Sequence, residues 1–320
     1  MGFKFISVIV PAHNEQEYIS QCLESLASQD YPTDNYEIIV VDNNSIDKTQ
    51  EIALQFNVQI IEQKTGPVGR VRNAGAKAAK GEVLAFIDGD CVAPTDWLSK
   101  GASLLLDKDT VCGGGYLLRP SPYWIEKAWL LENKAPPKEL LGGCIFIRKD
   151  DFFLAGPFDE KITSGEDTKL SMSLRNQNYS LIMTEELDVI HLGNPTTLKN
   201  FFLRQIWHSE NYLQNWHETV KDPTFYFLIL FLIGFISLLT GTISENITAM
   251  LISTTIITGT PLIFTIKRLR RSRNIDRNLR NLPAIYFLDF IYLSGRLLGL
   301  GKSTWKAFAL FIPPQSRRGD

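Results

Sequence analysis

The stretch GRVRNAGAKAAKGEVLAFIDGDC, residues 69–91, decides the fold of the N-terminal part of the chain. Its first half has a helical pattern of small and basic residues, whereas residues 83–87 form a short apolar run typical of a strand. This run ends directly in Asp88-Gly89-Asp90. Because ligands bind outside the carboxyl ends of strands in open α/β sheets, the stretch predicts a helix, a buried strand and an acidic turn that faces a ligand.

The residues before this stretch repeat the alternation of short apolar runs and helical runs. We expect strands at 5–10, 36–41 and 58–61, and helices at 15–29 and 48–55. Such alternation predicts βαβ units around a mostly parallel sheet, so the fold class is α/β. The first run leads straight into Pro11 without a cleavage site, and we therefore expect a strand rather than a signal peptide. Asp42 ends the second strand and should meet Asp88 in one crevice.

Two acidic pairs are candidates for chemistry. Asp88 and Asp90 are spaced so that both carboxylates can reach one hard divalent cation, and Gly89 lets the backbone approach phosphate groups. The competing interpretation is a strand-end turn in which an aspartate only caps the backbone. Glu166 and Asp167 open a second helical pattern further on. They could carry chemistry, or simply stabilise the first turn of that helix through its dipole.

Four motifs follow one another in a fixed order, namely VIVPAHNE (8–15), VVDNNSIDKT (40–49), the stretch 69–91, and GEDTKLSMSLRNQNY (165–179). The sequence resembles the family 2 glycosyltransferases over about its first two hundred residues. An ordered set is far more specific than a single short motif. The resemblance implies the GT-A fold, with a mixed, mostly parallel sheet that binds a nucleotide-diphosphate sugar.

The resemblance also implies which residues bind the donor. Residues at the end of the first strand would line the base and ribose, Asp42 would contact the same part, and the start of the 69–79 helix would approach the diphosphate. For His13 a plain turn residue remains the alternative, and Arg70 is interpreted as a solvated arginine. The donor-binding set is Pro11, Ala12, His13, Glu15, Asp42, Arg72, Asn73 and Asp88.

The same resemblance implies a metal ion and a general base. Asp90 would bind Mn²⁺ or Mg²⁺ directly, Asp88 would contact the ribose or reach the metal through water, and His191 would lie near the metal. Such an ion acts as a Lewis acid on the leaving diphosphate. Asp167, with Glu166 beside it, would accept the proton of the acceptor hydroxyl. For His191 a structural histidine is the alternative.

The C-terminal part has a membrane pattern. Residues 225–243 and 248–266 are almost wholly apolar over about 19 residues each, which is enough to cross a bilayer core. About seven Lys and Arg follow in 267–280, so the positive-inside rule predicts a hairpin with a cytoplasmic catalytic domain. A third apolar stretch, 284–300, holds Asp289 and Arg296 on one face. We expect it to lie in the membrane interface rather than to cross.

These patterns predict a GT-A catalytic domain at 1–200 and an interfacial helix or linker at 201–222. A transmembrane helical hairpin at 223–266 and a basic cytoplasmic segment with an interfacial helix at 267–320 complete the chain. A net charge of −2 and a pI of about 6.1 argue against a nucleic-acid partner. The four cysteines are widely spaced and form no CxxC pair, which is typical of a reducing cytoplasm.

The predicted function is metal-dependent, inverting transfer of a sugar from a nucleotide-sugar donor to a lipid-linked or membrane-associated acceptor. UDP is the most frequent nucleotide in the family. Transfer to a polyprenyl phosphate is the first alternative. A nucleotidyltransferase is disfavoured because residues 11–14 lack a Gly-rich basic phosphate loop, and a membrane scaffold because the apolar hairpin is nearly uncharged. The expected location is the inner cell membrane, with several crossings.

Overall fold

The structure, a computed structural model, describes residues 3–105, 108–131, 135–210, 212–213, 216–274 and 278–311. The chain forms two compact units. Unit 1 comprises Met1–Ser121 and Ala135–Asn194, and unit 2 comprises Pro122–Lys134 and Pro195–Asp320. The last boundary between the units lies at 194/195. Residues 122–134 group with unit 2 because Ile125 and Ala128 are buried against apolar side chains of its helices.

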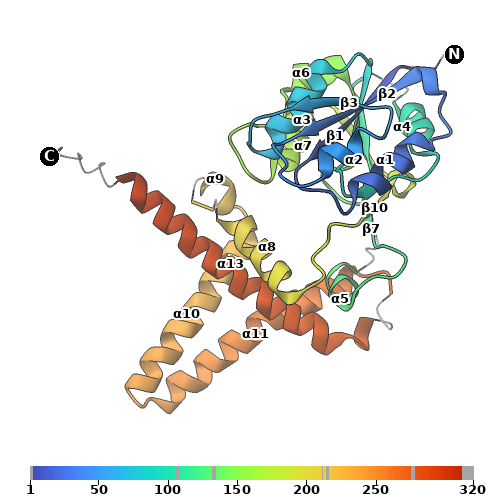
Figure 1. The fold of residues 1–320 in the computed structure, drawn as a ribbon. Helices are drawn as coiled ribbons and strands as arrows, with labels where there is room; N and C mark the ends of the chain where they lie inside the picture. The colour runs from blue at the N-terminus through green and yellow to red at the C-terminus, as the bar shows by residue number, and fades with distance from the viewer. Residues whose placement is uncertain are drawn as a thin grey trace. The chain divides into compact units, whose positions relative to one another are not determined.

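Unit 1 is built on a seven-stranded sheet with the order β3-β2-β1-β4-β8-β6-β9 (Figure 1). The strands β3, β2, β1 and β4 run parallel, β8 is antiparallel to both of its neighbours, and β9 is parallel to β6. This mixed, mostly parallel sheet confirms the predicted fold class. The strands are β1 Ile6–Ala12, β2 Tyr36–Asp42, β3 Gln59–Glu62, β4 Val83–Phe86, β6 Thr110–Gly113, β8 Ile145–Arg148 and β9 Ser180–Met183.

Helices cover both faces of this sheet (Figure 1). Because neighbouring strand residues point to opposite faces, Val8 and Val10 of β1 join one core with α1 and α4, while Ile9 joins the other with α3, α6 and α7. Gly75 lets α3 lie close to the sheet, since a Cβ there would stand 2.5 Å from Ile9 Cγ2. The helices are α1 Ile19–Ala27, α2 Thr49–Ala53, α3 Val68–Ala78, α4 Trp97–Leu104, α6 Lys149–Ala155 and α7 Glu166–Asn176, with short 3-10 turns at Thr33–Asn35 and Glu185–Leu187.

A second, three-stranded sheet with the order β5-β10-β7 lies in unit 1. Its strands are β5 Cys91–Val92, β7 Tyr116–Leu117 and β10 Val189–His191. The antiparallel pairing of β10 with β5 sets His191 opposite Cys91. This small sheet therefore brings residues from three distant parts of the sequence beside Asp90. All four cysteines of the chain are buried free thiols of unit 1.

The described part of unit 2 is helical, and it contains three helices long and apolar enough to cross a membrane: α10 Pro223–Ile243, α11 Ile247–Arg271 and α13 Leu282–Phe311, the last judged over Leu282–Trp305. The first two match the predicted apolar stretches. The basic run 267–271 forms the last turns of α11, where cations complement the helix dipole. Residues 275–277 and 312–320 of the predicted basic segment lie outside the described residues. The shorter helices are α5 Trp124–Trp129, α8 Leu198–Ser209 and α9 Trp216–Thr219.

The charges of α13 have partners inside unit 2. Asp289 is fully buried, and it accepts hydrogen bonds from Thr265 Oγ1 at 2.8 Å and from an Arg268 terminal nitrogen at 2.7 Å. Arg296 donates to the Tyr212 hydroxyl at 3.0 Å. We expect 284–300 to lie in the interface partly because burial of these two charges in a membrane costs free energy. Asp289 is thus paired with a cation, whereas Arg296 bonds to a neutral hydroxyl, and the pairing of Asp289 weakens the argument against a crossing by α13.

Candidate active site

The ends of β1 and β2 form one side of the candidate site. Asp42, the last residue of β2, is buried and its Oδ2 accepts hydrogen bonds from Ser45 N at 3.1 Å and Gln50 Nε2 at 2.9 Å. Its Oδ1 is buried without a hydrogen-bond partner among the described residues. Because a buried oxygen without a partner costs free energy, Oδ1 is placed to accept a hydrogen bond from a ligand.

The loop after β1 lies between Asp42 and the acidic turn at Asp88-Gly89-Asp90. His13 Nδ1 stands 2.9 Å from Asn43 O. A Cβ on Gly89 would be 3.2 Å from Pro11 O and 3.5 Å from Glu15 Cγ. The structure therefore brings Pro11, Ala12, His13 and Glu15 to the same edge of the sheet as the acidic turn. Their contact with a donor stays a prediction.

Arg72 is the central cation of the site. The residue is 3% exposed, and its guanidinium donates at 2.6 Å to Asp88 Oδ1 and at 2.6 Å to Glu166 Oε1. Burial alone would lower the pKa of Arg72, but Asp88 and Glu166 raise it above its ordinary value. Arg72 thus joins two carboxylates from distant parts of the sequence. Its predicted contact with the donor diphosphate stays a prediction.

Asn73, the next residue of α3, is also buried. Its side-chain amide donates to Phe158 O at 2.8 Å and to Glu160 Oε1 at 3.1 Å, and its Oδ1 accepts from Phe158 N at 3.1 Å. These bonds fix the loop before α7 against α3. Asn73 thus has a structural task here, and donor binding by Asn73 remains untested.

Asp90 lies beside a possible metal site. One ligand atom each of Asp90, Cys91 and His191 lie within 4.8 Å of one another. His191 Nε2 is 3.4 Å from Asp90 Oδ2, and its Nδ1 is buried with no hydrogen-bond partner in the part of the chain that the structure describes. Burial, together with Asp90 and Asp88, raises the pKa of the Cys91 thiol well above its ordinary value, so this side chain is neutral. A carboxylate and an imidazole fit a divalent cation such as Mn²⁺.

The acidic pair at the start of α7 divides between the interior and the site. Glu166 is 6% exposed, and burial raises the pKa of its carboxyl above the ordinary value. Asp167 is half-buried, and its two oxygens accept from Thr168 N at 2.7 Å and Gly142 N at 3.2 Å. Gly165, with φ of 85°, allows the sharp entry into the helix. Of the two, Asp167 is the more exposed, and the catalytic roles of both stay predictions.

Tyr116 is a site residue that the sequence did not single out. Its hydroxyl donates to Asp88 Oδ2 at 3.4 Å and accepts from Gly143 N at 3.1 Å, while its ring centre is 4.8 Å from that of His191. Burial raises the pKa of its phenol well above the ordinary value, so the hydroxyl keeps its proton. The only signal in the sequence is its place directly after three glycines, 113–115.

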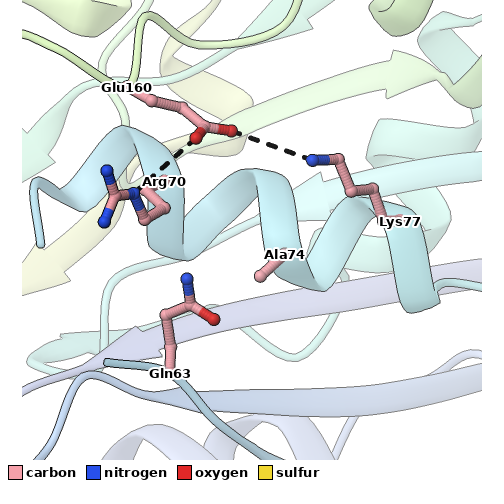
Figure 2. A pocket seen from close by; sticks show the side chains of 5 residues that line it. All are labelled: Gln63, Arg70, Ala74, Lys77 and Glu160. Carbon is pink, nitrogen blue, oxygen red and sulfur yellow. Dashed lines mark ion pairs between the residues drawn. The ribbon is translucent and has the colours of Figure 1, made fainter. Parts of the chain in front are cut away.

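A separate hollow of about 540 Å³ lies on another face of α3 (Figure 2). Arg70 and Lys77 flank it, and Glu160 pairs with them at 3.7 and 3.8 Å. Gln63 lies across from α3 and its backbone N–H bonds to Asp42 O at 2.8 Å. The side chain of Arg70 is 42% exposed, which agrees with its interpretation as a solvated arginine.

Comparison with known proteins identifies the family. Residues 7–154 match Glycosyl transferase family 2. Glycosyltransferase AglE of Haloferax volcanii is 33% identical over 206 residues, which cover 60% of this chain and 68% of that protein. The chain belongs to glycosyltransferase family 2. As a member, the protein is an enzyme that transfers glycosyl groups, and the nucleotidyltransferase and scaffold alternatives fall away.

Two further proteins resemble this glycosyltransferase over most of its length. The Methanococcus voltae dolichyl N-acetyl-alpha-D-glucosaminyl phosphate 3-beta-D-2,3-diacetamido-2,3-dideoxy-beta-D-glucuronosyltransferase is 27% identical over 334 residues, 94% of this chain and 99% of that protein. The mannosyltransferase PcManGT from Pyrobaculum calidifontis, solved with GDP-Man and Mn²⁺, has a TM-score of 0.61 at 16% identity, covering 96% and 88% of the two chains. The second likeness confirms the GT-A fold of the family 2 glycosyltransferase.

Proposed function

We propose that this glycosyltransferase moves a sugar from a nucleotide-sugar donor to a lipid-linked or membrane-associated acceptor, with inversion and with a divalent cation. One observation carries the proposal. Arg72 holds Asp88, beside the metal-type cluster, and Glu166, beside Asp167, through two hydrogen bonds of 2.6 Å. The acid that we assign to the metal side and the neighbour of the proposed base are thereby held on one guanidinium, which supports a single site for both steps of the displacement.

The donor would lie along the ends of β1 and β2. The unpaired Oδ1 of Asp42 would accept from the base or the ribose, with His13 and Glu15 beside it. Pro11 and Ala12 would line the same part of the crevice. We propose UDP as the nucleotide. The related PcManGT was solved with a GDP-sugar, so both nucleotides enter the test below.

Asp90 and His191 would hold Mn²⁺ or Mg²⁺, with Asp88 close by. Such an ion would stabilise the negative charge that grows on the leaving nucleoside diphosphate. Asp90 and His191 fit this role because a carboxylate oxygen of Asp90 and a ring nitrogen of His191 lie within 4.8 Å of each other. In addition, His191 Nδ1 is buried without a hydrogen-bond partner among the described residues. The Mn²⁺ in the PcManGT structure is consistent with this choice of ion.

Asp167 would act as the general base. Its carboxylate would take the proton of the acceptor hydroxyl while the oxygen attacks the anomeric carbon on the face opposite the leaving diphosphate, which inverts the configuration. Arg72 and the buried Glu166 would keep α7 in place beneath it. The hydrogen bond from Gly142 N would help to hold the Asp167 carboxylate in place.

The acceptor would be held by a membrane. The three apolar helices support membrane association, and the name of the Methanococcus relative describes a dolichyl-phosphate-linked acceptor. We place the catalytic unit on the cytoplasmic side of the cell membrane. A polyprenyl phosphate as direct acceptor is the second candidate, because an anionic nucleophile would need no base.

The test incubates membranes containing the full-length protein with labelled UDP-N-acetylglucosamine, UDP-glucose or GDP-mannose, followed by extraction of lipids. We expect transfer that EDTA abolishes and Mn²⁺ or Mg²⁺ restores, and a loss of at least about 10²-fold in Asp90→Ala and Asp167→Asn. The exposed Asp34→Asn, at the other end of β2, is the control. Transfer that is unchanged by EDTA, by Asp90→Ala and by Asp167→Asn would refute the mechanism. Loss of transfer in Asp90→Ala but not in Asp167→Asn would favour the polyprenyl phosphate as acceptor.

A further inference from the structure

A closed ring of hydrogen bonds connects the two acidic sides of the site. One half runs from Asp88 through Arg72 to Glu166, the neighbour of Asp167. The other half runs from Asp88 through the Tyr116 hydroxyl to the backbone of Gly142 and Gly143, and from there to Asp167. Both halves connect Asp88 with Asp167, one through Arg72 and the other through Tyr116. The relative position of Asp88 and Asp167 is therefore set twice.

We propose that Tyr116 is a positioning residue, whose hydroxyl fixes the spacing between Asp88 and Asp167 by holding the loop at 142–143. This inference rests on the proposed function, because it gives Asp88 the metal side and Asp167 the base side of the reaction. A phenol suits the task since a hydroxyl donates one hydrogen bond and accepts another. Here it donates to Asp88 Oδ2 and accepts from Gly143 N.

The loop is shaped to meet this hydroxyl. A Cβ on Gly143 would stand 2.6 Å from Asp88 Oδ2 and 2.7 Å from the Tyr116 hydroxyl. A Cβ on Gly142 would stand 2.5 Å from the Arg72 guanidinium. Two glycines thus allow the loop backbone to lie directly against both halves of the ring. The contact is made by backbone atoms and requires glycine at both positions, so it depends on where the loop backbone lies.

The ring of Tyr116 and its hydroxyl have separable tasks. The ring packs against His191, with centres 4.8 Å apart, and it remains in Tyr116→Phe. The hydroxyl alone reaches Asp88 and Gly143. Tyr116→Phe should therefore leave the metal-type cluster in place and release only the loop.

The first experiment follows backbone hydrogen exchange in the full-length protein in detergent. In Tyr116→Phe the Gly143 N–H loses its acceptor, and we expect the peptide that covers 142–143 to exchange on the order of tenfold faster. Tyr179→Phe is the matched control, because the buried Tyr179 hydroxyl also bonds a carboxylate, that of Asp151 at 3.3 Å, outside the ring. Unchanged exchange at 142–143 in Tyr116→Phe would overturn the inference.

The second experiment separates positioning from binding. We expect Tyr116→Phe to lower kcat on the order of tenfold, with the donor KM and the Kd for Mn²⁺ alone, measured by electron paramagnetic resonance, within about twofold. Tyr179→Phe should leave all three unchanged. An unaltered kcat, or a parallel loss of Mn²⁺ affinity, would overturn the positioning role alone. Absence of transfer by the unaltered protein from every donor tested would instead refute the proposed function.

Discussion

At the scale of single residues, Arg72 is the buried cation that joins two carboxylates, those of Asp88 and Glu166. A guanidinium has two terminal nitrogens held in a fixed plane. Arg72 donates from one of them to Asp88 and from the other to Glu166. A lysine would offer a point charge instead of this fork. Removal of one partner from a buried ion pair leaves an uncompensated charge, which costs far more than the loss of an exposed pair.

Arg72→Met keeps most of the volume and removes the charge. We expect the free energy of unfolding to fall by about 3–5 kcal/mol, because Glu166 is left ionised and buried. Chemical denaturation of the full-length protein in detergent measures this. Arg175→Met, which breaks the exposed pair with Glu139, is the control and should cost less than about 1 kcal/mol.

The pH dependence of the Arg72→Met defect follows from Glu166. Burial holds the pKa of its carboxyl above the ordinary 4.5, and removal of the cation raises it further. A raised pKa in the folded state means that ionisation of Glu166 opposes folding above pH 4.5, and that protonation relieves the cost as the pH falls. The stability gap between wild type and Arg72→Met should therefore narrow from pH 7 toward pH 4.5. A gap that widens would show that Glu166 is not the source of the defect.

At the scale of helices and strands, the elements that the sequence predicted best are those with local patterns. The four parallel strands lie within two residues of the predicted runs. β1 and β4 are buried along their whole length and β2 over its last five residues, so these three are marked by apolar runs, whereas β3 is a short, partly exposed edge strand. The first helix begins at Ile19 and not at residue 15. There, Asn14 has a φ of 57°, and the backbone N–H of Glu15 bonds to Thr49, so the chain continues as a loop.

The rest of the site depends on pairings between distant segments, which no local pattern encodes. Strand β8 pairs with β4 although about sixty residues separate them, and the pairing of β10 with β5 sets His191 beside Asp90. Tyr116 has no motif of its own. Family resemblance supplied the acidic residues, whereas the ring that joins them through Arg72 and Tyr116 became apparent only from the structure.

Close packing of α3 on the sheet can be tested by Gly75→Ala. A Cβ there would stand 2.5 Å from Ile9 Cγ2 and 3.0 Å from Val41 Cγ2, so overpacking should cost about 1–3 kcal/mol despite the better helix propensity of alanine. Gly301→Ala in α13 is the control, since nothing lies within 4 Å of its Cβ position. Thermal unfolding should show a lower midpoint for Gly75→Ala only. An equal or higher midpoint would mean that β1 and β2 yield easily.

At the scale of the whole molecule, unit 2 combines apolar helices with paired charges. Asp289 in α13 bonds to Thr265 and Arg268 of α11, and the Arg268 guanidinium lies 3.7 Å from the centre of the Trp129 ring. Hydropathy alone treats each helix as isolated and counts such charges as a penalty. The sequence assigned 284–300 to the interface, but α13 has the length and composition of a third span, and the pairing of Asp289 lowers the cost of burying that charge in it.

The orientation of the helices can be tested by labelling. Glu245 lies between α10 and α11, and we expect Glu245→Cys to react with a membrane-impermeant maleimide in intact cells, because the positive-inside rule places this turn outside. Lys267→Cys, near the other end of α11, should react only after permeabilisation. The unaltered protein serves as the blank. The reverse pattern would put the catalytic unit on the outer side.

The positions of the cysteines allow unfolding of the catalytic unit to be measured separately from that of the helical unit. Cys22, Cys91, Cys112 and Cys144 are all buried, and all belong to unit 1. A dye that fluoresces on reaction with thiols would therefore not react while the catalytic unit is folded. Unfolding of the helical unit, which has no cysteine, would give no signal. Heating the detergent-solubilised enzyme with and without a nucleotide would then report binding to the catalytic unit, before any sugar or acceptor is known.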